Sequence, residues 1–95
     1  MDVSRKIIQY IMNIAESSRN EDTFRYGLST RGLIALKKAS QAWAFINGRP
    51  YVIPDDVKAV FSPVSYHRLY PSAELKVDER KEYLSDFLDK VPVLL

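Results

Sequence analysis

The chain has 95 residues, with 14 basic and 12 acidic side chains and a net charge of +2. Compact domains usually hold about 100 to 200 residues, so we expect one small domain and not a complete enzyme. The absence of cysteine excludes disulfides, thiolate metal sites and cysteine nucleophiles, and it fits an intracellular protein. The single histidine, His67, cannot form a metal cluster alone, so no metal site is expected.

Membranes and nucleic acid are not the expected partners. The longest uninterrupted apolar run, residues 42–46, is far shorter than the roughly 20 residues of a membrane-spanning helix. The N-terminal residues MDVSRKII lack the hydrophobic stretch of a signal peptide, so a cytoplasmic location is expected. Basic and acidic residues alternate, whereas a surface that binds nucleic acid concentrates Lys and Arg on one face.

The first two expected elements are helices. Residues 3–18 place apolar side chains at i, i+4, i+7, i+8 and i+11, which is one stripe of an amphipathic helix. A polar loop follows as far as Gly27. Ser29 or Thr30 then caps a second helix, which runs to Asn47 and stops at Gly48. This longest helix is expected to be central, with these residues on its buried face: Leu33, Leu36, Ala39, Trp43 and Ile46.

Two more helices complete the expected fold. Pro54 suits the first position of a third helix, because its missing N–H needs no partner there, and the acidic Asp55 and Asp56 complement that helix's positive end. We expect Pro63 to break or restart this helix and Pro71 to end it. A last helix is expected over residues 78–90. Its apolar side is expected to hold Tyr83, Leu84, Phe87, Leu88 and Val91. The fold class is therefore an all-α bundle of four to five helices, with at most a very short extended segment near 51–53.

The usual catalytic signatures are absent from the sequence. The glycines do not form the G-x-x-x-x-G-K-[ST] phosphate loop of a nucleotide hydrolase, so these residues cannot hydrolyse ATP alone. His67 is interpreted as a histidine that caps or packs at a helix end. Asp55 and Asp56 are interpreted as acids at a helix start and not as an acid–base pair. An aromatic and basic stacking surface for single-stranded nucleic acid is a minor alternative; it would use Phe24, Arg25, Tyr26, Tyr66, His67, Arg68 and Tyr70.

Arg31 stands apart because it lies in the first turn of the second helix, where the positive end of the helix repels a cation. A solvated surface arginine leaves that position unexplained. An anion held at the helix N-terminus would turn the repulsion into a gain, since an arginine there adds a bidentate phosphate donor to the free N–H groups. The residues alone leave both interpretations open.

Several ordered motifs resemble the C-terminal lid domain of MoxR-type AAA+ ATPases. They are G-L-S-T-R-G at 27–32, the alanine-rich helix that follows, G-R-P-Y-V-I-P-D-D-V at 48–57 and H-R-L at 67–69. The resemblance is close over residues 27–69, and the segment YIMNIAESSR in the first helix is similar to the first lid helix. Two positions differ: the family usually has proline at Thr30 and a threonine or serine cap at Ile53.

The resemblance implies a function that the residues alone do not give. Arg31 corresponds to the sensor-2 arginine, which reaches the γ-phosphate of ATP, and Thr30 stands beside it. Residues 1–95 would form the lid, while the α/β domain that binds ATP and Mg²⁺ lies outside this chain. No cofactor is expected for the isolated lid. The implied partners are that α/β domain, neighbouring subunits of a hexameric ring and von Willebrand factor A-type proteins, in chaperone-like maturation of other complexes.

A free-standing helical adaptor or DNA-binding module is the alternative function. It is suggested by the isoelectric point near 8.9 and by the helix, extended segment and helix around residues 48–57. The sequence leaves open what His67 and Arg68 do.

Overall fold

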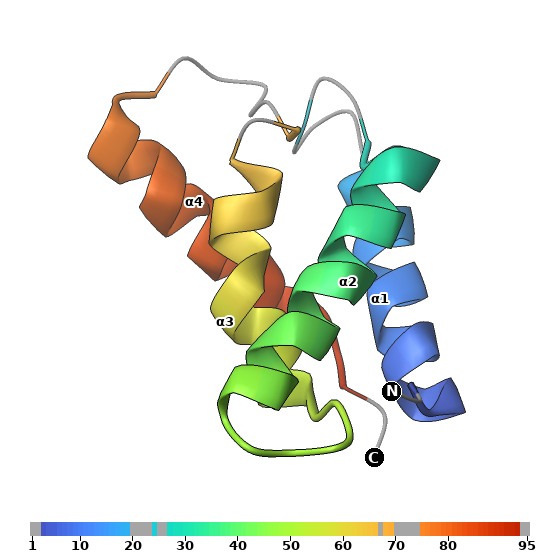
Figure 1. Cartoon of the computed structure of the whole chain (residues 1–95). Helices are drawn as coiled ribbons and strands as arrows, with labels where there is room; N and C mark the ends of the chain where they lie inside the picture. Colours follow the sequence, from blue (N-terminus) through green and yellow to red (C-terminus); the bar gives the residue numbers. More distant parts are fainter. Residues whose placement is uncertain (1–2, 20–23, 25–26, 67, 70–74, 94–95) are drawn as a thin grey trace.

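The computed structural model describes residues 3–19, 24, 27–66, 68–69 and 75–93. Within them it contains four α-helices, so the predicted all-α bundle is confirmed (Figure 1). The helices are α1 (Arg5–Ser18), α2 (Thr30–Ile46), α3 (Pro54–Ser65) and α4 (Val77–Lys90). No helix in the described part of the chain is both long and apolar enough to cross a membrane.

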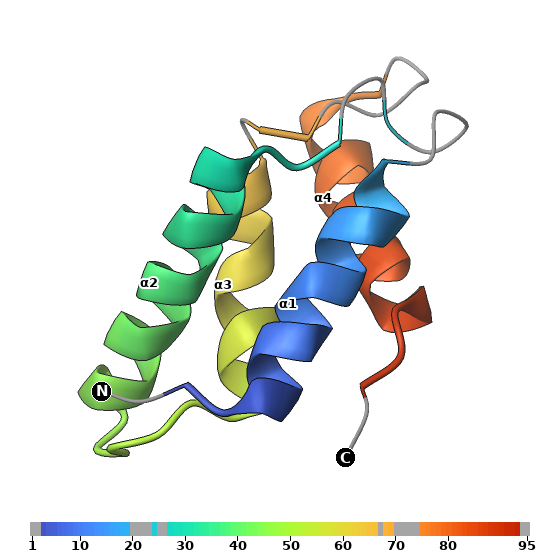
Figure 2. The same cartoon turned by 90° about the vertical axis from the view of Figure 1, so that its right-hand side faces the viewer.

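Each end of the bundle contains one end of every helix. Figures 1 and 2 show the N-terminus of α2 at the same end as the C-termini of α1 and α3 and the N-terminus of α4. We call this the Arg31 end. The opposite end holds the loop from α2 to α3, and we call it the Asp56 end. Helix α3 packs against all three other helices, so α3 and not the longer α2 is the central helix.

The helix boundaries follow local capping chemistry. The Ser4 side chain accepts a hydrogen bond from the Ile7 amide (3.3 Å) at the start of α1. At the end of α2, Gly48 adopts a positive φ of 78°, and its amide and that of Arg49 donate to carbonyls of Phe45 and Ala44. A glycine in this left-handed conformation is a common helix stop. The predicted ends of α1, α2 and α4 are confirmed to within two residues.

The buried face of α2 differs from the predicted one. Its fully buried positions are Gly32, Leu36, Ser40 and Ala44, which follow one another every fourth residue. Trp43 is 43% exposed and Ile46 is 75% exposed, so their predicted burial is wrong. Three of these four residues are small, which lets α2 approach α3 closely, while Trp43 and Ile46 lie on the flank of the helix.

Pro63 was also predicted wrongly, because α3 continues through it to Ser65. The proline lacks the N–H that would reach the carbonyl of Ala59 one turn earlier. Both residues lie on the exposed side of α3, where water can replace the missing donor. Helix α3 ends at Ser65, and the predicted stop at Pro71 lies outside the described residues.

The core fills the space between the four helices. Phe24, from the connection between α1 and α2, packs edge-on against Tyr83 and Phe87 of α4, and Phe61 of α3 stacks on Phe87. The apolar face predicted for α4 is confirmed by Leu84, which is fully buried. The other large apolar residues that are almost completely buried are Ile7, Tyr10, Ile11, Ile14, Leu28, Leu36, Val57, Leu69 and Leu88.

Candidate anion site at the start of helix α2

Ser29 caps the first turn of α2. Its Oγ accepts a hydrogen bond from the Gly32 amide (3.1 Å), and its carbonyl accepts one from the Leu33 amide (2.9 Å). Of the two predicted caps, Ser29 is the one found, because Thr30 is already the first helical residue. The Thr30 side chain is exposed beside the cap.

Arg31 lies in this first turn with its side chain exposed. It forms no hydrogen bond or ion pair with any residue that the structure describes. The first turn of α2 contains no acidic residue. The positive end of the helix and the guanidinium therefore lie together without a counter-charge from α2 itself, which is an arrangement that favours an anion.

The segment that leads into α2 is fixed to the end of α1. The buried hydroxyl of Ser18 donates to the Ala15 carbonyl (2.6 Å) and accepts from the Leu28 amide (2.8 Å). A Cβ on Gly27 would lie 2.6 Å from Cγ and 3.1 Å from Cα of Arg19, so only glycine fits against α1 here. The backbone just before the cap therefore has one defined path.

Sequence reasoning missed the role of Ser18, although a signal was present. Ser18 falls four residues after Ile14, so it continues the apolar stripe of α1 into the core. A buried hydroxyl needs hydrogen-bond partners, and here they link α1 to the segment that leads into α2.

The turn after α3 covers the other side of the α2 start. A Cβ on Gly32 would lie 2.7 Å from Leu28 Cδ1 and 3.3 Å from Arg68 Cδ. Arg68 is exposed, and its Nη1 donates to the Val64 carbonyl (2.9 Å). The structure thus brings Arg68 against Gly32, the residue after Arg31, which its position in the sequence did not indicate.

Arg80 of α4 holds this turn in place. Its Nη2 donates to the carbonyls of Tyr66 and Leu69, the second at 2.9 Å, and its guanidinium lies 4.3 Å from the centre of the Tyr66 ring. The proposed nucleic-acid stacking surface is not supported, because Phe24 is 1% exposed within the core and Tyr66 is covered by Arg80. Its other members Arg25, Tyr26, His67 and Tyr70 lie outside the described residues.

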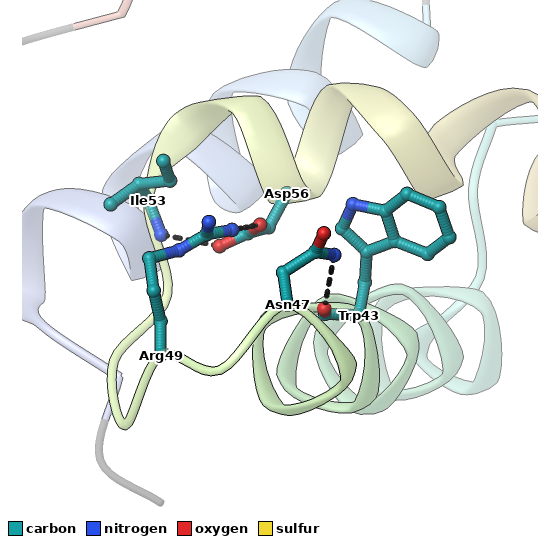
Figure 3. Close-up of polar contacts among 5 residues, drawn as sticks. All are labelled: Trp43, Asn47, Arg49, Ile53 and Asp56. Atoms are coloured by element: carbon teal, nitrogen blue, oxygen red, sulfur yellow. Dashed lines mark hydrogen bonds and ion pairs between the residues drawn. The ribbon is translucent and has the colours of Figure 1, made fainter.

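The paired carboxylates Asp55 and Asp56 lie in the first turn of α3, and Figure 3 shows Asp56 with its partners Arg49 and Ile53. Asp56 is 1% exposed, forms an ion pair with Arg49 and accepts a hydrogen bond at Oδ2 from the Ile53 amide (2.8 Å). Asp55 beside it is exposed. The interpretation of both as helix-start acids is confirmed. Asp56 provides the carboxylate half of a capping box, while Ile53 has no hydroxyl to provide the other half.

A known protein family matches most of this chain, including the start of α2. A family model described as the AAA lid domain matches residues 16–86, which is most of the chain. This chain is an AAA lid domain. The match favours the lid interpretation over a free-standing adaptor or DNA-binding module.

Relatives and a solved structure place this lid domain in the MoxR-like ATPase family. It is 36% identical to the uncharacterized protein YeaC of Bacillus subtilis (strain 168) over 92% of the chain, and 34% identical to Protein MoxR of Paracoccus denitrificans over 67%. A crystal structure of a Cytophaga hutchinsonii protein assigned as an ATPase matches 98% of the chain with a TM-score of 0.81 and 25% identity. The lid domain spans 28%, 23% and 32% of these three proteins, respectively.

Proposed function

We propose that this lid domain forms part of a MoxR-like ATPase and that Arg31 is its sensor-2 residue, which contacts the terminal phosphate of ATP. The observation that carries the proposal is the exposed Arg31 guanidinium, without a partner among the described residues, in the first turn of α2. Arginine binds phosphate through two parallel N–H donors, and the helix N-terminus adds favourable backbone dipoles. Thr30 offers a hydroxyl beside the same group.

The rest of the ATP site must come from outside these 95 residues. The part of the chain that the structure describes contains no group of three or more His, Asp or Glu side chains that could hold a metal ion. The residues present therefore fit the phosphate of ATP but not Mg²⁺. We infer that an α/β domain elsewhere in the full-length protein supplies the metal ligands and the phosphate loop, and that the isolated lid binds ATP at best at millimolar concentration, about −4 kcal/mol.

Exposed apolar side chains support contacts with other domains. Ile8, Met12 and Ile34 are each more than 40% exposed and line a groove between α1 and α2. A second exposed set at the Asp56 end comprises Trp43, Phe45, Ile46 and Tyr51. Exposed apolar groups that cluster in this way mark interaction surfaces. They suit the α/β domain and a neighbouring subunit of a hexameric ring.

The wider role belongs to the same proposal. A ring of such ATPases would act in chaperone-like maturation of other complexes, with von Willebrand factor A-type proteins as partners. A relative, Chaperone MoxR1 of Mycobacterium tuberculosis, is 27% identical over 81% of the chain, and its name supports this role. The cytoplasmic location, expected from the absence of cysteine, is also part of the proposal.

The test is steady-state ATP hydrolysis by the full-length protein with Arg31→Ala. We expect kcat to fall at least about tenfold and KM for ATP to change less, because the contact strengthens as the terminal phosphate leaves. Arg5→Ala is the matched control, since Arg5 is an exposed arginine in the first turn of α1, which also has a serine cap and no first-turn acid.

Arg5→Ala should leave both constants within about twofold of wild type, because α1 has no proposed contact with ATP. Equal turnover by wild type and Arg31→Ala would refute the sensor assignment. A fall of the same size in both variants would show that removal of any first-turn arginine has this effect.

A further inference from the structure

Arg68 fills the space left by the missing side chain of Gly32. It comes from the turn after α3, yet its Cδ would lie 3.3 Å from a Cβ at position 32, while the buried Leu28 blocks the other direction at 2.7 Å. Gly32 follows Arg31 directly, and its amide is the donor to the Ser29 cap. The aliphatic part of Arg68 therefore packs on the turn of α2 that carries Arg31.

The backbone of Arg68 is held in place by α3 and α4. Its amide and that of Leu69 both donate to the Ser65 carbonyl, at 2.9 and 2.8 Å. Leu69 is fully buried, and its own carbonyl accepts from Arg80 at 2.9 Å. Because the turn is anchored on both sides, the backbone of Arg68 has a defined position beside α2.

A hydrogen bond of the Arg68 guanidinium explains why this position holds an arginine and not an apolar residue. Its Nη1 donates to the Val64 carbonyl (2.9 Å) in the last turn of α3, where carbonyls lack helical partners and carry partial negative charge. An apolar side chain of similar length could pack on Gly32 but could not make this bond. One residue thus links the C-terminus of α3 to the N-terminus of α2.

We propose that Arg68 is a positioning residue for Arg31: it fixes the first turn of α2, and so the direction in which the Arg31 guanidinium meets phosphate. This inference rests on the proposed sensor role of Arg31. Displacement of a catalytic contact by about 1 Å can lower a rate ~10²-fold, so even partial release of this turn affects turnover.

The test is a double-mutant cycle in the full-length protein, with kcat and KM for ATP measured for Arg68→Ala, Arg31→Ala and the double variant. We expect Arg68→Ala alone to lower kcat about threefold to tenfold with a smaller change in KM. In the Arg31→Ala background the same change should lower kcat less than about twofold, because Arg68 acts through Arg31. Arg68→Lys should recover most of kcat, since lysine keeps the stem and a donor for the Val64 carbonyl.

The control is Lys58→Ala, which removes an exposed cation from the middle of α3 and should leave kcat unchanged. Wild-type kcat in Arg68→Ala, or an equal loss of kcat with and without Arg31, would overturn the positioning role, the second result by showing that Arg68 acts independently. If Arg31→Ala itself hydrolyses ATP normally, the sensor assignment fails first. The two proposals can therefore be rejected separately.

Discussion

The two ends of α2 each lie beside an arginine, and the fold treats the two arginines in opposite ways. Arg49, just beyond the C-terminal end, is paired with the buried carboxylate of Asp56. Arg31, in the first turn, is exposed and has no partner among the described residues. Arg49 therefore has its counter-charge within the fold, and the contrast supports the proposal that Arg31 serves a group outside the described residues.

The starts of the four helices extend this comparison. Helices α3 and α4 each begin with two acidic residues, and Asp56 and Glu79 reach back to the backbone amides of Ile53 and Lys76. Helices α1 and α2 begin with a serine cap and an arginine and have no first-turn acid. Because Arg5 has the same position in α1, an arginine in the first turn does not by itself distinguish the start of α2. Only at α2 does a buried glycine follow, packed under the stem of Arg68.

The largest expected effect is on the free energy of unfolding, which should fall much more for a substitution on the buried face of α2 than for one on its exposed face. Leu36 is fully buried, so Leu36→Ala should lower the free energy of unfolding by about 2 to 5 kcal/mol. Trp43 is 43% exposed, so Trp43→Ala should cost only about 1 kcal/mol, far less than a buried tryptophan would. Urea unfolding of both variants checks this order. A greater loss for Trp43→Ala would place the indole, not Leu36, in the core.

The second expected effect concerns the ion pair between Arg49 and Asp56. Asp56→Ala removes the partner of Arg49 and the acceptor of the Ile53 amide, so we expect a loss of about 2 to 4 kcal/mol, reduced by the water that reaches Arg49. The neighbouring exposed Asp55 is the control, and Asp55→Ala should cost less than about 1 kcal/mol. Thermal unfolding measures both. Similar losses for the two variants would mean that the buried ion pair adds nothing beyond a helix-start charge.

High pH should lower the free energy of unfolding, because it ionises the buried side chain of Tyr10. Burial, and then the negative charges of Asp89 and Asp55, raise the pKa of Tyr10 to about 12 from its usual 10. The folded state therefore resists ionisation of the phenol. Its contribution to the free energy of unfolding is complete below pH 10 and is lost as the pH rises through 12, by about 3 kcal/mol.

Tyr10→Phe isolates this contribution from the other groups that titrate in the same range. The Tyr10 hydroxyl is buried without a partner among the described residues, so its removal should cost little at pH 7. The free energy of unfolding should then fall less steeply in the variant than in wild type between pH 10 and 12. Parallel curves for the two proteins would show that Tyr10 titrates normally.

Local chemistry made much of this fold predictable. Ser29, Gly48 and Pro54 each mark a helix boundary through their own hydrogen-bonding or backbone preference, and the structure has boundaries at all three. The apolar stripe of α4 was likewise visible because Leu84 and its neighbours recur at helical spacing. The position of Arg31 in a first turn follows from the same local signals.

The remaining features depend on packing between helices, which the local pattern does not encode. Gly32 and Ser40 are buried because small residues suit a close α2–α3 contact, whereas hydrophobicity alone favoured Trp43. Ser18 joins α1 to the segment before α2 through a hydroxyl that an apolar pattern does not count. Arg68 reaches the α2 start only because α3 returns the chain to that end of the bundle.

The most direct test of the central claim is the free energy of urea unfolding of the 95-residue chain with Arg31→Ala, measured beside Arg5→Ala. If Arg31 serves an external anion and not the fold, its removal deletes a cation from the positive end of a helix. Stability should then be unchanged or higher by a few tenths of a kcal/mol (roughly 0.3), as for Arg5→Ala. A loss of more than about 1 kcal/mol for Arg31→Ala alone would show that this arginine holds the fold together, and it would contradict a role for Arg31 toward an external phosphate.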